Sequence, residues 1–220
     1  LHEGDRDAAM SDSKARESLV SLGRSMFARR LTFGSSGNIS VRVEGGWLMS
    51  PTNVSLGDLD PARLARLDDN GNHVSGDAAA RESFLRGGVY RGRAGAGAVV
   101  HLHSTHSVAV SCLDGIDPDD VLPPITAYYV MRVGKLPLIP YFAPGDPALG
   151  EAVGRVAARH SAVLLANHGP VVAGTSLSAA VNAIEELEET ARLYLLLHGR
   201  PTRYLTPEQV AEIRKKYPNP

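Results

Sequence analysis

The sequence is poor in cysteine, and Cys112 is the only one. A single thiol cannot form a disulfide within the chain, and it cannot supply the cluster of thiolates that a cysteine-based metal site needs. This scarcity excludes the disulfide-rich secreted domains, and it favours a protein of the reducing cytoplasm.

Long apolar runs and an excess of charge of one sign are also missing. No run approaches the roughly 18 apolar residues of a transmembrane helix, so we expect no membrane-spanning segment. The 23 basic and 24 acidic side chains are well mixed, and the net charge is −1, so we expect no nucleic-acid partner. The start of the chain lacks the apolar region of a signal peptide. We interpret residues 1–10 as an N-terminal extension or an expression remnant, with Met10 as the candidate natural start.

The composition that is present fits one globular domain. The chain has 220 residues, of which 43% are hydrophobic and 21% are charged. That length allows a substantial core, and the composition is that of a soluble globular protein. No internal repeat or low-complexity segment divides the chain. We therefore predict a single domain over residues 11–220.

The apolar periodicity predicts helices and strands that alternate in groups. Apolar residues at helical spacing predict helices over 13–30, 79–91, 147–159, 176–198 and 207–216, and shorter ones near 58–62 and after a capping Ser104. Apolar runs between turn residues predict strands over 38–43, 46–50 and 63–67, one ending at His103, one within 136–141, and two within 161–174 that are broken at 167–170. The helices fall between strands that pair as hairpins. We therefore predict a layered α+β-type domain with a mixed or antiparallel sheet between helical layers.

Histidines stand at the end of one apolar run, in "AVVHLHSTHSVAV" at 98–110. Side chains alternate between the two faces of a strand, so His101 and His103 point the same way and can share one metal ion. A third ligand must come from elsewhere, and His168 is the best candidate because it follows an apolar strand at a sharp turn, where Gly169 and Pro170 shape the backbone. Three histidines with one open position is the pattern of a catalytic zinc site.

Two other interpretations of the histidines remain open. His101 and His103 could be incidental polar residues at the mouth of a strand, since an HxH pair alone is a weak signal. His106 could replace one ligand, but it belongs to the following helix and would point elsewhere. The remaining histidines of residues 11–220 read as ordinary surface or helix-end residues: His73, His160 and His198.

Five short motifs, taken together, resemble the class II aldolase/adducin family. They are "GNIS" at 37–40, "SPT" at 50–52, Glu82, "HLH" at 101–103 and "NHGP" at 167–170. The resemblance covers roughly residues 13–200, and it looks closest to the branch of 3-oxo-tetronate 4-phosphate decarboxylases. It implies an α/β fold of three α/β/α layers around a mixed, mostly antiparallel sheet. It also implies a cyclic homotetramer with active sites between neighbouring subunits.

The same resemblance implies a role for each site residue. It places Zn²⁺, with Mn²⁺ or Co²⁺ as alternatives, on His101, His103 and His168, and it makes Glu82 the acid/base, with a pKa that burial should tune toward neutral. A tyrosine from a neighbouring subunit would shuttle a proton, and Tyr128 and Tyr129 are the candidates, with Tyr204 a weaker one. The phosphate would be held by two loops, at Ser35, Ser36, Gly37, Asn38, Thr52 and Asn53.

The segment before Glu82 departs from the family pattern. It reads "GDAAARES", so Ala80 stands where a phosphate-binding hydroxyl is expected, and Arg81 precedes the glutamate. Either Arg81 supplies the contact to the anion, or the phosphate is held more weakly, or the substrate differs. Without the family pattern, Glu82 would read as a solvated helix residue in a surface pair with Arg86.

The resemblance implies a metal-dependent carbon–carbon lyase. The expected reaction decarboxylates 3-oxo-tetronate 4-phosphate to dihydroxyacetone phosphate and CO₂ through an enediolate that zinc stabilises. A sugar-phosphate aldolase of the fuculose 1-phosphate type, or a ribulose-phosphate 4-epimerase, would share the metal site. A non-enzymatic module like the adducin head domain is the third alternative, and it would be expected to have lost the metal ligands.

Overall fold

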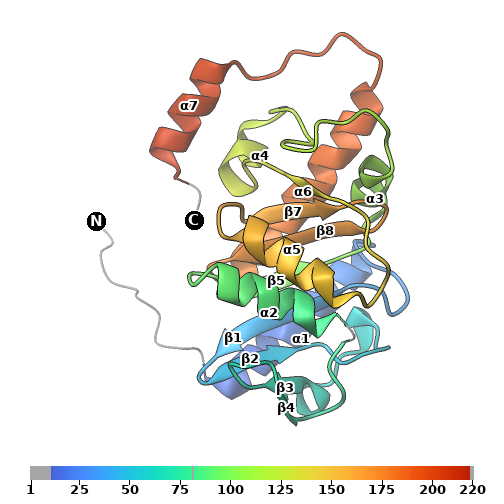
Figure 1. The fold of residues 1–220 in the computed structure, drawn as a ribbon, viewed down its shortest axis with the longest axis vertical. Coiled ribbons are helices and arrows are strands. Elements are labelled where there is room, and N and C mark those ends of the chain that lie inside the picture. Colours follow the sequence, from blue (N-terminus) through green and yellow to red (C-terminus); the bar gives the residue numbers. More distant parts are fainter. Residues whose placement is uncertain (1–10, 81, 219–220) are drawn as a thin grey trace.

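The computed structural model describes residues 11–80 and 82–218, and the predicted N-terminal extension, residues 1–10, lies outside this part of the chain. Within the described residues, eight strands form one sheet in the order β4-β3-β2-β1-β5-β8-β7-β6 (Figure 1). The pairing is antiparallel throughout except between β6 and β7, which run parallel. The strands are β1 Asn38–Val43, β2 Gly46–Met49, β3 Ala65–Leu67, β4 His73–Ser75, β5 Ala98–His101, β6 Leu138–Ile139, β7 Ala162–Leu165 and β8 Gly169–Gly174.

Helices cover both faces of this sheet. The helices α1 and α6 lie on one face, and α2 and α5 lie on the other (Figure 1). The predicted α/β fold of three α/β/α layers around a mixed, mostly antiparallel sheet is therefore confirmed. The helices are α1 Asp12–Ala28, α2 Ser83–Gly92, α3 Thr105–Ser111, α4 Ala127–Arg132, α5 Pro147–Ala157, α6 Leu177–Leu197 and α7 Pro207–Lys216, with 3₁₀ turns η1 Leu56–Asp58 and η2 Pro61–Arg63.

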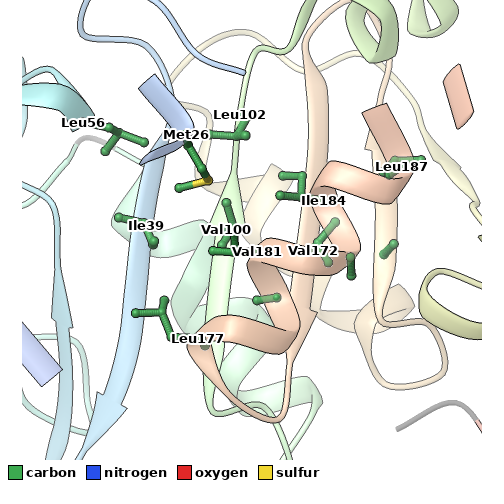
Figure 2. Close-up of a cluster of buried hydrophobic side chains, with 14 of the residues drawn as sticks. Met26, Ile39, Leu56, Val100, Leu102, Val172, Leu177, Val181, Ile184 and Leu187 are labelled. Atoms are coloured by element: carbon green, nitrogen blue, oxygen red, sulfur yellow. The ribbon is translucent and has the colours of Figure 1, made fainter. Parts of the chain in front are cut away.

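The central strand β5 divides its side chains between two hydrophobic cores. Ala98 and Val100 belong to the core under α1 and α6, part of which Figure 2 shows, and Val99 belongs to the core under α2 and α5. The alternation of strand side chains then places His101 on the α2 side of the sheet, at the end of the strand. The helix that begins beside Glu82 therefore covers the face to which His101 belongs.

Helices α2 and α5 pack at very short range because glycines meet at their contact. A β-carbon added at Gly88 would lie 2.2 Å from the carbonyl oxygen of Gly150, and one added at Gly92 would lie 2.3 Å from that of Gly154. Any side chain at these positions would collide with backbone. The glycines thus set how closely α2 approaches its neighbour.

Several predicted elements differ from the structure. The helix expected near 58–62 is instead the two 3₁₀ turns, and neither β4 nor α4 was predicted. Ser104 does precede α3, but its hydroxyl makes no capping hydrogen bond. The carboxylate of Glu188 caps α3 instead, and it accepts from the backbone N–H groups of His106 and Ser107, each at 2.9 Å. Among the described residues, no helix has both the length and the apolar character to cross a bilayer.

Candidate metal centre

Three imidazoles and one carboxylate converge at the end of β5. The Nε2 atom of His103 lies 3.1 Å from the Nε2 atoms of both His101 and His168. The two oxygens of Glu82 lie 3.3 Å from the Nε2 atoms of His101 and His168. All four groups offer one ligand atom within 4.8 Å of one another, so the residues predicted to meet do meet.

The local backbone structure positions each histidine at the cluster. His101 ends β5, and His103 follows two residues later on the same side. His168 stands in the turn between β7 and β8, where Asn167 has a φ of 56° and Gly169 a φ of 150°. A β-carbon at Gly169 would lie 2.4 Å from the carbonyl oxygen of Leu102. The turn therefore presses against the histidine loop, and glycine is required where the two backbones meet.

The three rings turn their Nε2 atoms toward one another. The Nδ1 atom of His101 lies 2.8 Å from the carbonyl oxygen of Pro170. A carbonyl can only accept, so Nδ1 carries a proton and Nε2 is the nitrogen that faces the cluster. Burial, together with the nearby His101 and His168, lowers the pKa of His103 to about 4. Neutral imidazole is the form that binds metal ions.

The spacing of the nitrogens fits a divalent metal. Four ligands at 2.0–2.1 Å around a tetrahedral zinc ion would be about 3.4 Å apart. The observed separations of 3.1 Å at His103 are close to that value. Nitrogen donors also suit several other first-row metals. The donor set therefore fits a divalent metal without selecting one.

Glu82 adjoins this cluster at the start of α2. It stands immediately before the first residue of the helix, and its Oε2 atom accepts a hydrogen bond from the Asn38 amide at 3.3 Å. Burial works to raise the pKa of its carboxyl, but the contacts with His101 and His168 outweigh burial and hold the pKa well below its ordinary value. Burial and the two histidine contacts therefore act on the pKa of this carboxyl in opposite directions.

A pocket of about 510 Å³ opens onto the cluster. Glu82, His103 and His168 form part of its wall, whereas His101 is fully buried behind them. The rest of the wall includes three aromatic residues and an amide that the sequence analysis missed: Phe33, Tyr141, Phe142 and Asn167. Of these four residues, only Asn167 could be suspected from the sequence, because it precedes the predicted ligand His168 in "NHGP".

None of the described residues predicted to hold phosphate lies in the pocket wall, although two of them adjoin the cluster of histidines and Glu82. Asn38 touches Glu82, and Gly37, with a φ of 75°, packs against the backbone of 101–102. Ser35, Ser36 and Thr52 are not part of the pocket wall. Arg81 lies outside the described residues.

Two of the predicted phosphate residues have other local roles. The Ser36 hydroxyl donates to the carbonyl of Phe33 at 2.6 Å, within its own turn. Thr52 pairs its backbone with Ala78, and Asn53 is exposed with a φ of 56°. The loop at 52–53 thus lies beside the segment that leads to Glu82, but no side-chain contact joins the two among the described residues.

The two candidate tyrosines lie on the short helix α4. Tyr129 is buried in the core under α1 and α6, and burial raises the pKa of its hydroxyl. Tyr128 is exposed, with the guanidinium of Arg132 5.4 Å above its ring. Neither lines the pocket of its own chain. Tyr204 is exposed in the segment between α6 and α7.

Arg86 does not form the surface pair considered for Glu82. Its side chain is fully buried, and its Nη2 atom donates to the carbonyl oxygen of Asn38 at 2.9 Å. The interpretation of Glu82 as a solvated residue paired with Arg86 is therefore wrong. His106 points away from the cluster, as expected, and its Nδ1 atom lies 2.8 Å from Glu188.

Comparison with known proteins places this arrangement in one family. Residues 17–195 match the family model described as "Class II Aldolase and Adducin N-terminal domain". The 3-oxo-tetronate 4-phosphate decarboxylase of Pectobacterium atrosepticum is 46% identical over 213 residues, which cover 96% of this chain and 98% of that protein. The L-fuculose phosphate aldolase of Escherichia coli is 30% identical, covering 94% of this chain and 96% of the relative.

A solved structure shows the same architecture. The crystal structure of YgbL from Escherichia coli, described as a candidate aldolase, epimerase or decarboxylase, superposes with a TM-score of 0.91 at 45% sequence identity. The match covers 92% of this chain and 99% of that chain. Sequence and fold therefore agree on the same group of relatives.

Proposed function

The chain belongs to the class II aldolase and adducin family, and from that membership we propose that it is a metal-dependent lyase that decarboxylates 3-oxo-tetronate 4-phosphate to dihydroxyacetone phosphate and CO₂. The observation that carries the proposal is the convergence of three histidines and Glu82 in a chain that matches a decarboxylase along nearly its whole length. Neither the cluster nor the sequence match would support the proposal alone. The cluster fits several reactions, and identity without the cluster would not imply catalysis.

The proposed metal ligands are His101, His103 and His168, with Zn²⁺ as the proposed ion. The Nε2 atoms that face one another support this assignment, as does the carbonyl of Pro170, which fixes the ring of His101. When bound, a divalent ion supplies a Lewis acid at the point where negative charge develops on the substrate. Imidazoles held in fixed positions would strengthen that effect.

The chain's own residues must handle the proton. In the reaction, the bond between C1 and C2 breaks, CO₂ leaves, and the electron pair moves to the oxygen of the C3 carbonyl. The resulting enediolate takes up one proton at C2 and becomes dihydroxyacetone phosphate. Glu82 is the proposed carrier of that proton, because its carboxyl is the one that lines the pocket beside the histidines. The amide of Asn38 orients the carboxyl by donating to Oε2.

Fewer observations support the binding site for the phosphate group of the substrate. We assign it to the Gly37–Asn38 turn and the Thr52–Asn53 loop, with Ser35, Ser36 and Arg81 as further candidates. Support comes from the turn itself, since Gly37 has a positive φ and lies against the backbone of His101. Backbone N–H groups in such a turn can bind an anion without any large side chain.

Assembly and location are part of the same proposal. We propose a homotetramer in which an exposed tyrosine enters the pocket of a neighbouring subunit, and Tyr128 fits that role better than the buried Tyr129. The exposed aromatic residues Phe33 and Tyr141 at the pocket wall are consistent with a neighbour that covers them. We propose a cytoplasmic location, in keeping with the single Cys112.

An aldolase or a 4-epimerase is the second candidate. The relative named L-fuculose phosphate aldolase supports it, although at lower identity than the decarboxylases. An interaction module without catalysis is disfavoured because the chain keeps all four residues of the cluster.

A direct assay separates these candidates. Purified protein loaded with Zn²⁺ is given 3-oxo-tetronate 4-phosphate, and CO₂ and dihydroxyacetone phosphate are measured. The proposal predicts that the two products appear in equal amounts. L-Fuculose 1-phosphate and ribulose 5-phosphate serve as competing substrates. Rapid aldol cleavage or epimerisation, with no CO₂ from the keto acid, would replace the decarboxylase assignment.

A further inference from the structure

Arg86 is an unusual residue for the interior of this protein. It lies on α2 and has an exposed fraction of 0%, and it is the largest fully buried side chain of the described residues. Removing a guanidinium from water is costly unless it is paired and its donors are satisfied. A buried arginine therefore needs a reason that packing alone does not give.

The contacts of Arg86 leave most of its donors unused. Its Nη2 atom donates to the carbonyl oxygen of Asn38 at 2.9 Å. Its Nε and Nη1 atoms have no hydrogen-bond partner within residues 11–80 and 82–218. The guanidinium is thus held at one point, which is the main chain of Asn38.

Asn38 connects this arginine to the metal centre in two ways. Its side chain donates to Oε2 of Glu82 at 3.3 Å. Its backbone is paired with His101, across β1 and β5. Glu82 and Arg86 are four residues apart at the start of α2, so both lie on the same side of that helix. The two residues therefore reach Asn38 from one helix, Arg86 at the main chain and Glu82 at the side chain.

We propose that Arg86 is a positioning residue, which fixes the main chain at Asn38 and through the Asn38 amide the orientation of the Glu82 carboxylate. The inference rests on the proposed function, because Glu82 is the group that handles the substrate proton. The guanidinium itself is fully buried and is not part of the pocket wall. Its contribution is to keep the turn and the start of α2 in one relative position.

The test compares Arg86→Met with a matched control. Methionine fills a similar volume but cannot donate to Asn38. The control is Arg42→Met. Arg42 is a partly buried arginine on β1, the strand that begins at Asn38, and it donates to the carbonyls of Ala96 and Tyr90, away from the pocket. Each variant is measured for kcat and KM, for thermal unfolding, and for the absorption spectrum of bound Co²⁺.

We expect Arg86→Met to lower kcat by ten- to a hundredfold, with KM within about threefold, and to change the Co²⁺ spectrum because Glu82 contacts the ligating rings. Arg86→Lys should recover much of kcat, because its ammonium can still donate to the Asn38 carbonyl. Arg42→Met should leave kcat and the spectrum unchanged. If Arg86→Met does not fold, Arg86→Gln replaces it, since its shorter side chain loses the same bond.

A folded Arg86→Met or Arg86→Gln with the kcat and the Co²⁺ spectrum of the wild type would overturn the inference. So would an equal effect in Arg42→Met. The spectrum needs no substrate, so the inference remains testable if the wild type fails to release CO₂. In that case the proposed function fails, and an altered spectrum in the Arg86 variants would still support the positioning role.

Discussion

Single residues at the metal centre make contacts that other side chains cannot replace. The Nε2 atom of His103 lies 3.1 Å from those of both other histidines, so this ring is the middle member of the cluster. His101 is held from behind by the carbonyl of Pro170. Each ring thus turns its Nε2 atom toward the cluster, where the proposed metal would bind.

We predict that His103→Ala abolishes metal binding. Mutation of a residue that hydrogen-bonds to a metal ligand lowers metal affinity by about 10- to 100-fold. Removal of the ligand itself should lower the affinity by more. Metal content of the dialysed protein measures the effect, and decarboxylation should be lost with it. His73→Ala, on the edge strand β4, serves as the control and should keep its metal. A metal content equal to that of the wild type in His103→Ala would refute the ligand assignment.

Glu82→Gln should separate metal binding from proton transfer. The amide keeps the shape of the side chain but cannot carry the proton, so we expect kcat to fall by about 10²- to 10⁴-fold. Metal content should stay near the wild-type value, because the three rings remain. A variant that keeps full activity would show that another group delivers the proton.

Gly169→Ala should damage the metal centre without touching a ligand. A methyl group there would meet the carbonyl oxygen of Leu102 at 2.4 Å, and the backbone has a φ of 150°. We expect a loss of stability of about 2 kcal/mol or more, together with weaker metal binding, because the turn that carries His168 must shift. Urea unfolding and metal titration measure the two effects. Stability and affinity both equal to wild type would contradict the role given to this glycine.

At the scale of elements, α3 depends on a carboxylate from α6. Glu188 is buried and accepts four hydrogen bonds, from the backbone N–H groups of His106 and Ser107, the Ser107 hydroxyl and the His106 ring. Burial works to raise the pKa of Glu188, but these bonds outweigh it, and the pKa is lowered from its ordinary value of 4.5. The carboxylate therefore serves as the cap of α3 in its ionised form.

We predict that Glu188→Ala destabilises the protein by about 2–4 kcal/mol at neutral pH, because buried donors lose their acceptor. The folded pKa lies below the unfolded one, so the stabilisation is complete above pH 4.5 and is lost as the pH falls through the folded value. The wild type and the variant should therefore converge in strongly acidic solution. Denaturant unfolding between neutral and acidic pH checks this, and a difference independent of pH would exclude an ionised cap.

The elements also show which features the sequence can predict. Long helices and paired strands follow from periodicity. Strand alternation predicts that His101 and His103 point the same way, but the predicted strand ends too late, because β5 ends at His101. The strand β4 has three exposed residues and exists by pairing with β3, which no local pattern encodes. Glu188 caps α3 from 82 positions away in the sequence. The local sequence suggested Ser104 as the cap and contained no indication of Glu188.

At the scale of the whole molecule, the metal centre joins distant parts of the chain. His103 and His168 are 65 positions apart, and Glu82 reaches them from the start of α2, the helix that covers the same face of β5 as His101. An ion bound there would bind the native state and not the unfolded chain. We predict that removing the metal with a chelator lowers the unfolding temperature, and that Zn²⁺ restores it.

Mass action sets the size of that effect. At a free metal concentration a thousand times the dissociation constant, the stabilisation is about 4 kcal/mol. Thermal unfolding at several Zn²⁺ concentrations measures it, and His103→Ala should show almost no dependence. A wild-type melting temperature that does not respond to chelation or to added metal would count against a site that binds only the folded chain.

The glycine contact between α2 and α5 has a consequence for the reaction distance. Gly88 lies six residues after Glu82, or about 9 Å along the helix axis. Because Gly88 fits directly against the backbone of Gly150, a single added carbon would push the two helices apart and tilt the beginning of α2. The distance between the Glu82 carboxylate and the imidazoles thus depends on Gly88 and Gly150, which have no reactive side chains. A larger side chain at Gly88 would change the reactivity of the site by displacing α2.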